Sequence, residues 1–205
     1  MPIKLAKLED LQTRLDVSAE NDLLNGLLEA VSAMCSQARF AGVDLRRTAG
    51  IVEYPAAEYG SNRLRVGRYP IESITEIKTL YSFGSDADFD AADALVENED
   101  YAIESSALGV LIRAHGCWQS EPRRQRVTYT AGFGDPAALG AGELEPPIDL
   151  QHGILQQCVF LHNTLGTAGL QELNAGGQGG KVKVAESKPH ADLVAACTAL
   201  RRLDV

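Results

Sequence analysis

The chain has 205 residues, a mass of 22.0 kDa and a formal net charge of −9, with 45% hydrophobic and 23% charged residues. This composition is typical of a globular protein that buries a core, organised as one domain or as one domain with an insertion. There is no run of about 18 apolar residues, and the first twenty residues are charged without an apolar signal core. We therefore expect neither a membrane span nor a secretion signal.

The acidic charge is concentrated in residues 84–101, which contain seven carboxylates and no lysine or arginine. These carboxylates are Asp86, Asp88, Asp90, Asp93, Glu97, Glu99 and Asp100. The rest of the chain is close to neutral, whereas a surface that grips nucleic acid needs clustered Lys and Arg to neutralise phosphates. The charge pattern argues against DNA gripping and is compatible with an acidic surface that DNA passes without sticking.

Helical periodicity dominates the first 43 residues. Residues 7–15 predict a short amphipathic helix, and residues 21–41 predict a long one with apolar side chains at the helical period. Gly42 follows at a position where helices commonly end. Residues 1–43 are therefore predicted to form the N-terminal helices of a helical body.

Residues 44–134 change to an alternating pattern that predicts a β-rich insertion. Short strands separated by Gly, Pro, Asn, Ser and Asp are predicted at residues 50–54, 63–69, 73–81, 101–104, 109–114 and 124–130. In the second strand, Leu64 and Val66 face one way and Arg63 and Arg65 face the other, as in a sheet with one solvated face. The insertion is therefore predicted to be antiparallel.

Helical periodicity returns in residues 145–205. Two prolines open a predicted helix at 147–165, because proline is tolerated in the first turn. Residues 166–188, rich in glycine and small polar residues, predict a flexible loop, and residues 189–203 predict a last helix. The predicted fold class is α+β: a small helical bundle with an inserted antiparallel β region.

The four cysteines, Cys35, Cys117, Cys158 and Cys197, form no CxxC pair and are predicted to be reduced, small core residues. Cys158 lies one helical turn from His162, with His152 further up the same helix, so a metal site can be drawn. This set lacks a fourth ligand and a supporting partner, and core packing is the favoured interpretation. We predict no metal and no cofactor.

Two loops approach known ion-binding motifs without matching them. Residues 175–182 resemble a phosphate-binding loop, but Ala175 and Val182 replace the first glycine and the hydroxyl residue, so a linker is favoured. Asp86, Asp88, Asp90 and Glu97 have the spacing of calcium ligands, yet Ala91 replaces the required glycine and Asp93 replaces an apolar residue. An acidic solvated loop is the favoured interpretation.

Several segments together resemble the head-tail connector (adaptor) proteins of tailed bacteriophages. The most specific segment is the VTYTAGF strand, followed by Pro-Ile-Asp-Leu and an apolar helix, and LVAACTALRRL is similar to the closing helix of that family. The LEDLQTRLDV start, the helix ending in ARFAG, RYPIESITEI, DYAIE and GVLIRA extend the resemblance over most of the chain. The glycine-rich segment 174–180 and the long acidic loop depart from the family pattern.

The resemblance implies a virion structural protein of the neck, made in the cytoplasm of the bacterial host, and no enzyme. It implies a ring of twelve copies that binds the portal protein and a downstream neck or tail completion protein, and through which DNA passes without sequence-specific binding. On this basis the last helix is predicted to contact the portal through Leu193, Leu200, Arg201, Arg202 and Leu203. The acidic loop, Asp86, Asp88, Asp90, Asp93 and Glu97, is predicted to line the channel or to face a neighbouring subunit.

Arginines of the β-rich insertion are candidate partners for that acidic loop in a neighbouring copy. They are Arg46, Arg47, Arg63, Arg65, Arg68, Arg123, Arg124 and Arg126. Two alternatives stay open. The first is that the chain is a tail-terminator or another neck ring protein. The second is that it is a small metal-dependent hydrolase that uses His115 and Cys117 or the set of residues 152, 158 and 162.

Overall fold

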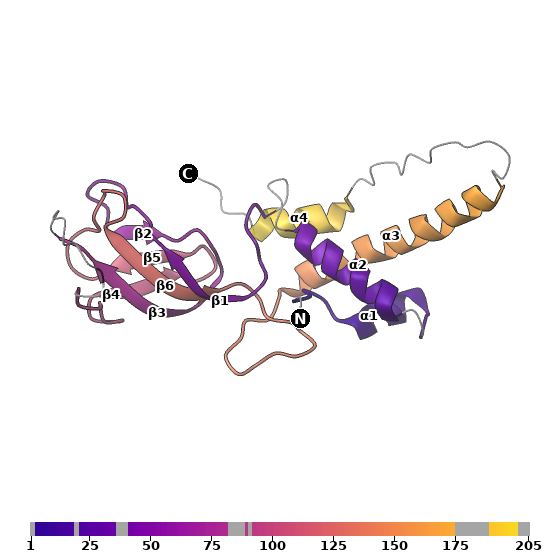
Figure 1. The fold of residues 1–205 in the computed structure, drawn as a ribbon, viewed down its shortest axis with the longest axis horizontal. Helices are drawn as coiled ribbons and strands as arrows, with labels where there is room; N and C mark the ends of the chain where they lie inside the picture. The colour runs from indigo at the N-terminus through magenta and orange to yellow at the C-terminus, as the bar shows by residue number, and fades with distance from the viewer. Residues whose placement is uncertain are drawn as a thin grey trace. The chain divides into compact units, whose positions relative to one another are not determined.

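The computed structural model describes residues 3–18, 21–35, 41–81, 89, 92–174 and 189–200, with the backbone alone for residues 165–174. Its helices are α1 (Leu8–Leu15), α2 (Asn21–Met34), α3 (Ile148–Asn174) and α4 (Ala191–Leu200). Its strands are β1 (Thr48–Glu53), β2 (Arg63–Arg65), β3 (Ile71–Thr79), β4 (Tyr101–Ser105), β5 (Val110–Arg113) and β6 (Gln125–Ala131). This α+β architecture confirms the predicted fold class (Figure 1).

The chain forms two compact units. The helical unit comprises Met1–Gly42, Gly134–Gly140 and Glu145–Arg201, and the sheet unit comprises Val43–Phe133, Ala141–Leu144 and Arg202–Val205. In the helical unit, α3 is the central element, because α1, α2 and α4 all pack against it. The apolar faces predicted from periodicity are buried there, and their fully enclosed side chains include Leu11, Leu24, Leu28, Leu150, Ile154 and Leu193.

The helix boundaries differ from the prediction in two places. The long helix predicted at residues 21–41 ends at Met34, Ala41 lies in a turn, and residues 36–40 lie outside the described residues. The loop predicted from residue 166 is wrong over residues 166–174, because α3 continues to Asn174. A glycine inside a helix costs about 1 kcal/mol, but adding residues to an existing helix needs no new nucleation, so Gly166 and Gly169 do not end it. Residues 175–188 and 201–203, the rest of the predicted loop and the end of the predicted last helix, lie outside the described residues.

The sheet unit contains two three-stranded antiparallel sheets, with strand orders β1-β6-β3 and β2-β5-β4. Their inner faces share one apolar core that includes Leu64, Val66, Ile77, Leu111, Trp118, Val127 and Tyr129. Leu64 and Val66 are fully buried while Arg63 and Arg65 are exposed, as the alternation predicted. In the described part of the chain, no helix is both long enough and apolar enough to cross a membrane.

Candidate functional site

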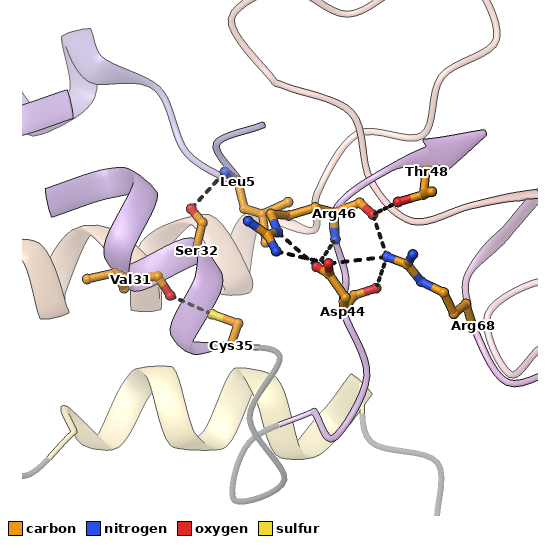
Figure 2. Close-up of polar contacts among 8 residues, drawn as sticks. All are labelled: Leu5, Val31, Ser32, Cys35, Asp44, Arg46, Thr48 and Arg68. Atoms are coloured by element: carbon orange, nitrogen blue, oxygen red, sulfur yellow. Dashed lines mark hydrogen bonds and ion pairs between the residues drawn. The ribbon is translucent and has the colours of Figure 1, made fainter. Parts of the chain in front are cut away.

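A polar network fixes the first residues of the sheet unit (Figure 2). Both carboxylate oxygens of Asp44 accept from the guanidinium of Arg46, each at 2.9 Å, and the backbone N–H of Arg46 donates to Asp44 Oδ1 at 3.1 Å. Arg68 Nη2 donates to the carbonyl oxygens of Asp44 at 3.3 Å and Arg46 at 3.2 Å. These contacts tie residues 44–46 to the loop between β2 and β3, which carries Arg68.

The residues that follow β6 are bound beside residues 45–47 of the sheet unit. The N–H of Arg47 donates to the carbonyl of Phe133 at 2.8 Å, and the N–H of Phe133 donates to the carbonyl of Leu45 at 2.7 Å. Gly132 has φ +99°, and an added Cβ would lie 2.5 Å from the carbonyl oxygen of Arg46. Only glycine therefore allows this approach. We call Asp44, Arg46, Arg68, Gly132 and Phe133 the crossing clamp.

Within the clamp, burial alone would raise the pKa of Asp44, but the hydrogen bonds and charges of Arg46 and Arg68 lower this pKa below its usual value. A carboxyl group with a lowered folded-state pKa stabilises the fold above its unfolded pKa of about 3.9 and loses that contribution as the pH falls through the folded value. We expect Asp44→Asn to lower the free energy of unfolding by about 1–2 kcal/mol at pH 7 and to reduce its fall in acid. Urea unfolding at pH 7 and pH 3 measures both.

The matched control for that experiment is Asp93→Asn, since Asp93 is an exposed carboxylate outside the clamp. It should leave the stability within about 0.5 kcal/mol of the wild type. Equal losses for the two variants, or no loss for Asp44→Asn, would contradict the assignment of a stabilising role to the clamp.

Most arginines proposed to face a neighbouring copy contact groups of their own chain. Arg47 binds Glu72 at 2.6 Å and Glu143 at 3.3 Å, Arg126 binds Glu76 at 3.0 Å, and Arg63 pairs with Glu104.

The other arginines of the set differ in their surroundings. Arg46 and Arg68 belong to the clamp, and Arg124 is buried and donates to the carbonyl of Leu80 at 3.2 Å. Arg65 and Arg123 are exposed and have no carboxylate partner within the described ranges. Sequence reasoning could count these arginines but could not assign their partners.

The acidic loop is described only in part. Asp86, Asp88 and Asp90 lie outside the described residues, whereas Asp93 and Glu97 are exposed. Phe89 lies on the sheet unit, with its ring 5.6 Å from that of Tyr54 and 5.4 Å from the guanidinium carbon of Arg126. The loop therefore carries an aromatic anchor on its own chain, which the charge pattern did not reveal.

In the predicted portal-contact helix, Leu193 is fully buried and Leu200 is half-buried, and Arg201, Arg202 and Leu203 lie outside the described residues. Leu193 packs against Gly153 of α3, where an added Cβ would lie 2.8 Å from the Leu193 Cα. The close helix crossing is therefore at Gly153. Gly26, the glycine whose position in α2 suggested such a crossing, has nothing within 4 Å of its Cβ position.

Three of the four cysteines are core residues, as predicted. Cys35, Cys158 and Cys197 are fully buried, whereas Cys117 is exposed and donates to the carbonyl of Gly60 at 3.1 Å, so the prediction is wrong for Cys117. A hydrogen bond with Cys197 and burial raise the pKa of Cys35, and burial raises the pKa of Cys158 to about 12. Cys35 and Cys158 are therefore neutral thiols at physiological pH, whereas the hydrogen bond with Cys35 lowers the pKa of Cys197.

The residues of the possible metal set lie in different environments. His152 is exposed and contacts Arg14 at 3.1 Å and Asp192 at 3.7 Å, while Cys158, on the same helix, is enclosed in the core. Across the residues that the structure describes, no group of three or more His, Cys, Asp or Glu side chains is placed to hold a metal ion. His115 and Cys117 likewise form no hydrogen bond with each other in this part of the chain.

Comparisons with known proteins identify this fold. The chain is similar to a solved chain of the neck of a native gene transfer agent (GTA) particle computed with C12 symmetry, with 14% identity, a TM-score of 0.51, and coverage of 98% of this chain and 91% of that chain. It is similar to a chain of the neck of an empty GTA particle computed with C6 symmetry, with 16% identity and a TM-score of 0.52 over the same shares.

A third similar structure is a chain of the virion of a native gene transfer agent particle, with 16% identity, a TM-score of 0.51, and coverage of 98% of this chain and 91% of that chain. No family model and no curated protein matches the sequence. At these identities the comparisons show a shared fold. The shared fold extends over almost the whole chain. The chain therefore has the fold of chains found in the necks of phage-like gene transfer agent particles, the class of fold that its sequence segments resembled.

Proposed function

We propose that this chain is a structural protein of the neck of a phage-like particle, where twelve copies form a ring between the portal and the next neck or tail protein. The observation that carries the proposal is the likeness of fold to neck chains over 98% of this chain. Those necks were computed with C12 and C6 symmetry, and both symmetries are compatible with a ring of twelve.

A ring needs a heterologous interface, in which one surface of a subunit fits a different surface of the next. The two units supply unlike surfaces with exposed apolar side chains. The helical unit exposes Leu23, Ile148 and Phe160, and the sheet unit exposes Val52, Tyr54 and Tyr59. Large exposed apolar side chains of this kind are typical of surfaces that another chain covers.

The acidic loop is proposed to line the DNA channel. Asp93 and Glu97 are exposed, and three further carboxylates precede them in the sequence. Most arginines of the sheet unit are already paired within their own chain, which favours a channel-lining role over a contact with a neighbour's arginines. Carboxylates along the channel would repel phosphates and keep the DNA mobile.

The end of the chain is proposed to contact the portal through Leu200, Arg201, Arg202 and Leu203, while Leu193 holds α4 on the helical unit. We expect the double variant Arg201→Glu/Arg202→Glu to lose binding to the portal of the same particle in a pull-down, because reversing two charges at an interface costs several kcal/mol. The folded chain itself should be unaffected, as thermal unfolding will check.

The matched control is Arg65→Glu/Arg123→Glu, which makes the same change of charge at two exposed arginines of the sheet unit. Portal binding that persists in the Arg201/Arg202 variant, or that is lost equally in both double variants, would reject the portal contact. Binding to a tail component in place of the portal would favour the alternative role of a tail-terminator ring.

A further inference from the structure

A groove in the helical unit runs between the first turns of α3 and the exposed side of α4. It has a volume of about 460 Å³. Its apolar lining includes Pro147, Leu150, Ala195, Ala199 and Leu200. The small alanine side chains leave room for an inserted chain, and this lining is suited to aliphatic side chains.

The charged residues of the groove are acidic. Asp149 and Asp192 lie on it, and both are exposed. Within the described residues Asp149 has no ion pair, and the groups within 4 Å of the Asp192 carboxylate are the imidazoles of His152, at 3.7 Å, and His190, at 3.6 Å. Among the residues that the structure describes, no lysine or arginine lines the groove. Its complement is therefore a short apolar segment that carries positive charge.

One segment of this chain has that chemistry. Residues 181–184 read Lys-Val-Lys-Val and lie outside the described residues. An extended segment with this alternation presents two lysines on one side and two valines on the other. Residues 201–205 are a poorer complement, because Asp204 offsets one of their two arginines and no apolar residue alternates with the two basic ones.

The geometry of α3 favours a groove on a different copy. Among its described side chains, the last fully buried one is Cys158, yet the helix continues for sixteen residues to Asn174. At 1.5 Å per residue, this carries the chain about 24 Å beyond the last buried turn. Figure 1 shows this half of α3 extending past α2 and α4. The chain thus leaves α3 far from its own groove.

The groove also runs in an unfavourable direction for its own chain. It follows α4 from Asp192 to Leu200, away from the point where the chain enters the helix at Ala191. To fill its own groove, the segment would have to pass the start of α4 and then reverse before entering the helix. A segment from a second copy needs no such reversal.

We propose that residues 181–184 of one copy bind in the groove of the next copy, with the two lysines facing Asp149 and Asp192 and the two valines on the apolar lining. This proposal rests on the ring function proposed above and names one contact that would close the ring. The contact is heterologous, since groove and segment are different surfaces, and it therefore propagates from copy to copy until the ring closes.

Disulfide cross-linking tests this contact directly. Val182→Cys is placed on a size-tagged chain and Ala195→Cys on an untagged one, both in the Cys117→Ser background, and the mixture is treated with a mild oxidant. We expect a cross-link between tagged and untagged chains. Filling the groove with Ala199→Trp should lower its yield about tenfold, whereas Thr198→Trp, an exposed neighbour on α4 that does not line the groove, should leave it unchanged.

Charge reversal gives a second, independent measurement. Lys181→Glu/Lys183→Glu should weaken self-association in sedimentation velocity, and adding Asp149→Lys should restore it in part, because the reversed pair attracts again. The absence of an intermolecular cross-link, a cross-link confined to one chain, or equal yields from the two tryptophan variants would each overturn the proposal. Rings seen by electron microscopy without the cross-link would overturn this contact and leave the ring intact, while the absence of both would reject the two proposals together.

Discussion

Gly132→Ala is expected to lower the free energy of unfolding of the sheet unit by about 2–4 kcal/mol. Two costs add at this position. Gly132 has φ +99°, which L-amino acids rarely adopt, and the new Cβ would lie 2.5 Å from the carbonyl oxygen and 2.6 Å from the carbonyl carbon of Arg46. Because both are backbone atoms, the backbone at Gly132 and the backbone at Arg46 would have to move apart.

Gly142→Ala is the control for this prediction. Gly142 also has a positive φ, +85°, but an added Cβ would meet nothing within 4 Å. It should therefore show the conformational cost alone, roughly 1 kcal/mol. Urea unfolding followed by Trp118 fluorescence reports on the sheet unit, since Trp118 lies in its core. Equal losses at the two glycines would mean that the close approach at Gly132 is not part of the native structure.

Gly153→Ala is expected to destabilise the helical unit by about 1–3 kcal/mol, even though alanine is the better helix former by about 1 kcal/mol. The added Cβ would lie 2.8 Å from the Cα of Leu193 and 3.1 Å from the carbonyl oxygen of Asp192. These backbone atoms belong to α4, so α4 must shift or detach. Amide hydrogen exchange should therefore show faster exchange in residues 193–200 than in the wild type.

Gly26→Ala is the matched control, because it makes the same change in α2 at an exposed position with open space. It should stabilise the chain by up to about 1 kcal/mol through helix propensity. The opposite signs of the two effects make the test sharp. A stabilising Gly153→Ala would show that α4 does not pack on α3 at this point.

The elements of this fold follow from local patterns, but their contacts do not. Alternation predicted the six strands and the inward side of β2, and helical periodicity predicted where α2 and α3 begin, since each pattern reflects which face is buried. The length of α3 was underestimated because glycine frequency is only a weak guide once a helix has begun. Gly153 could have been suspected from its place on the apolar face of α3, but only the packed structure distinguishes it from Gly26.

The candidate surfaces depend even more on tertiary structure. The sequence contains Arg47 and Glu72, but their pairing joins residues 25 positions apart and exists only once β1 and β3 flank β6. The groove beside α4 likewise needs α3 and α4 to be packed together, and both Asp149 and Asp192 line it. The net charge of the chain gave no indication of that local arrangement. Function inferred from these surfaces is therefore open to direct tests by substitution.

A cryo-electron microscopy map of the particle's neck would show whether this chain forms the proposed ring. We expect density for this chain in a closed ring directly below the portal, with twelve copies around an open axial channel and the acidic residues Asp93 and Glu97 facing the channel. Density for this chain at any other place in the particle, or its absence from the purified particle, would overturn the proposed ring.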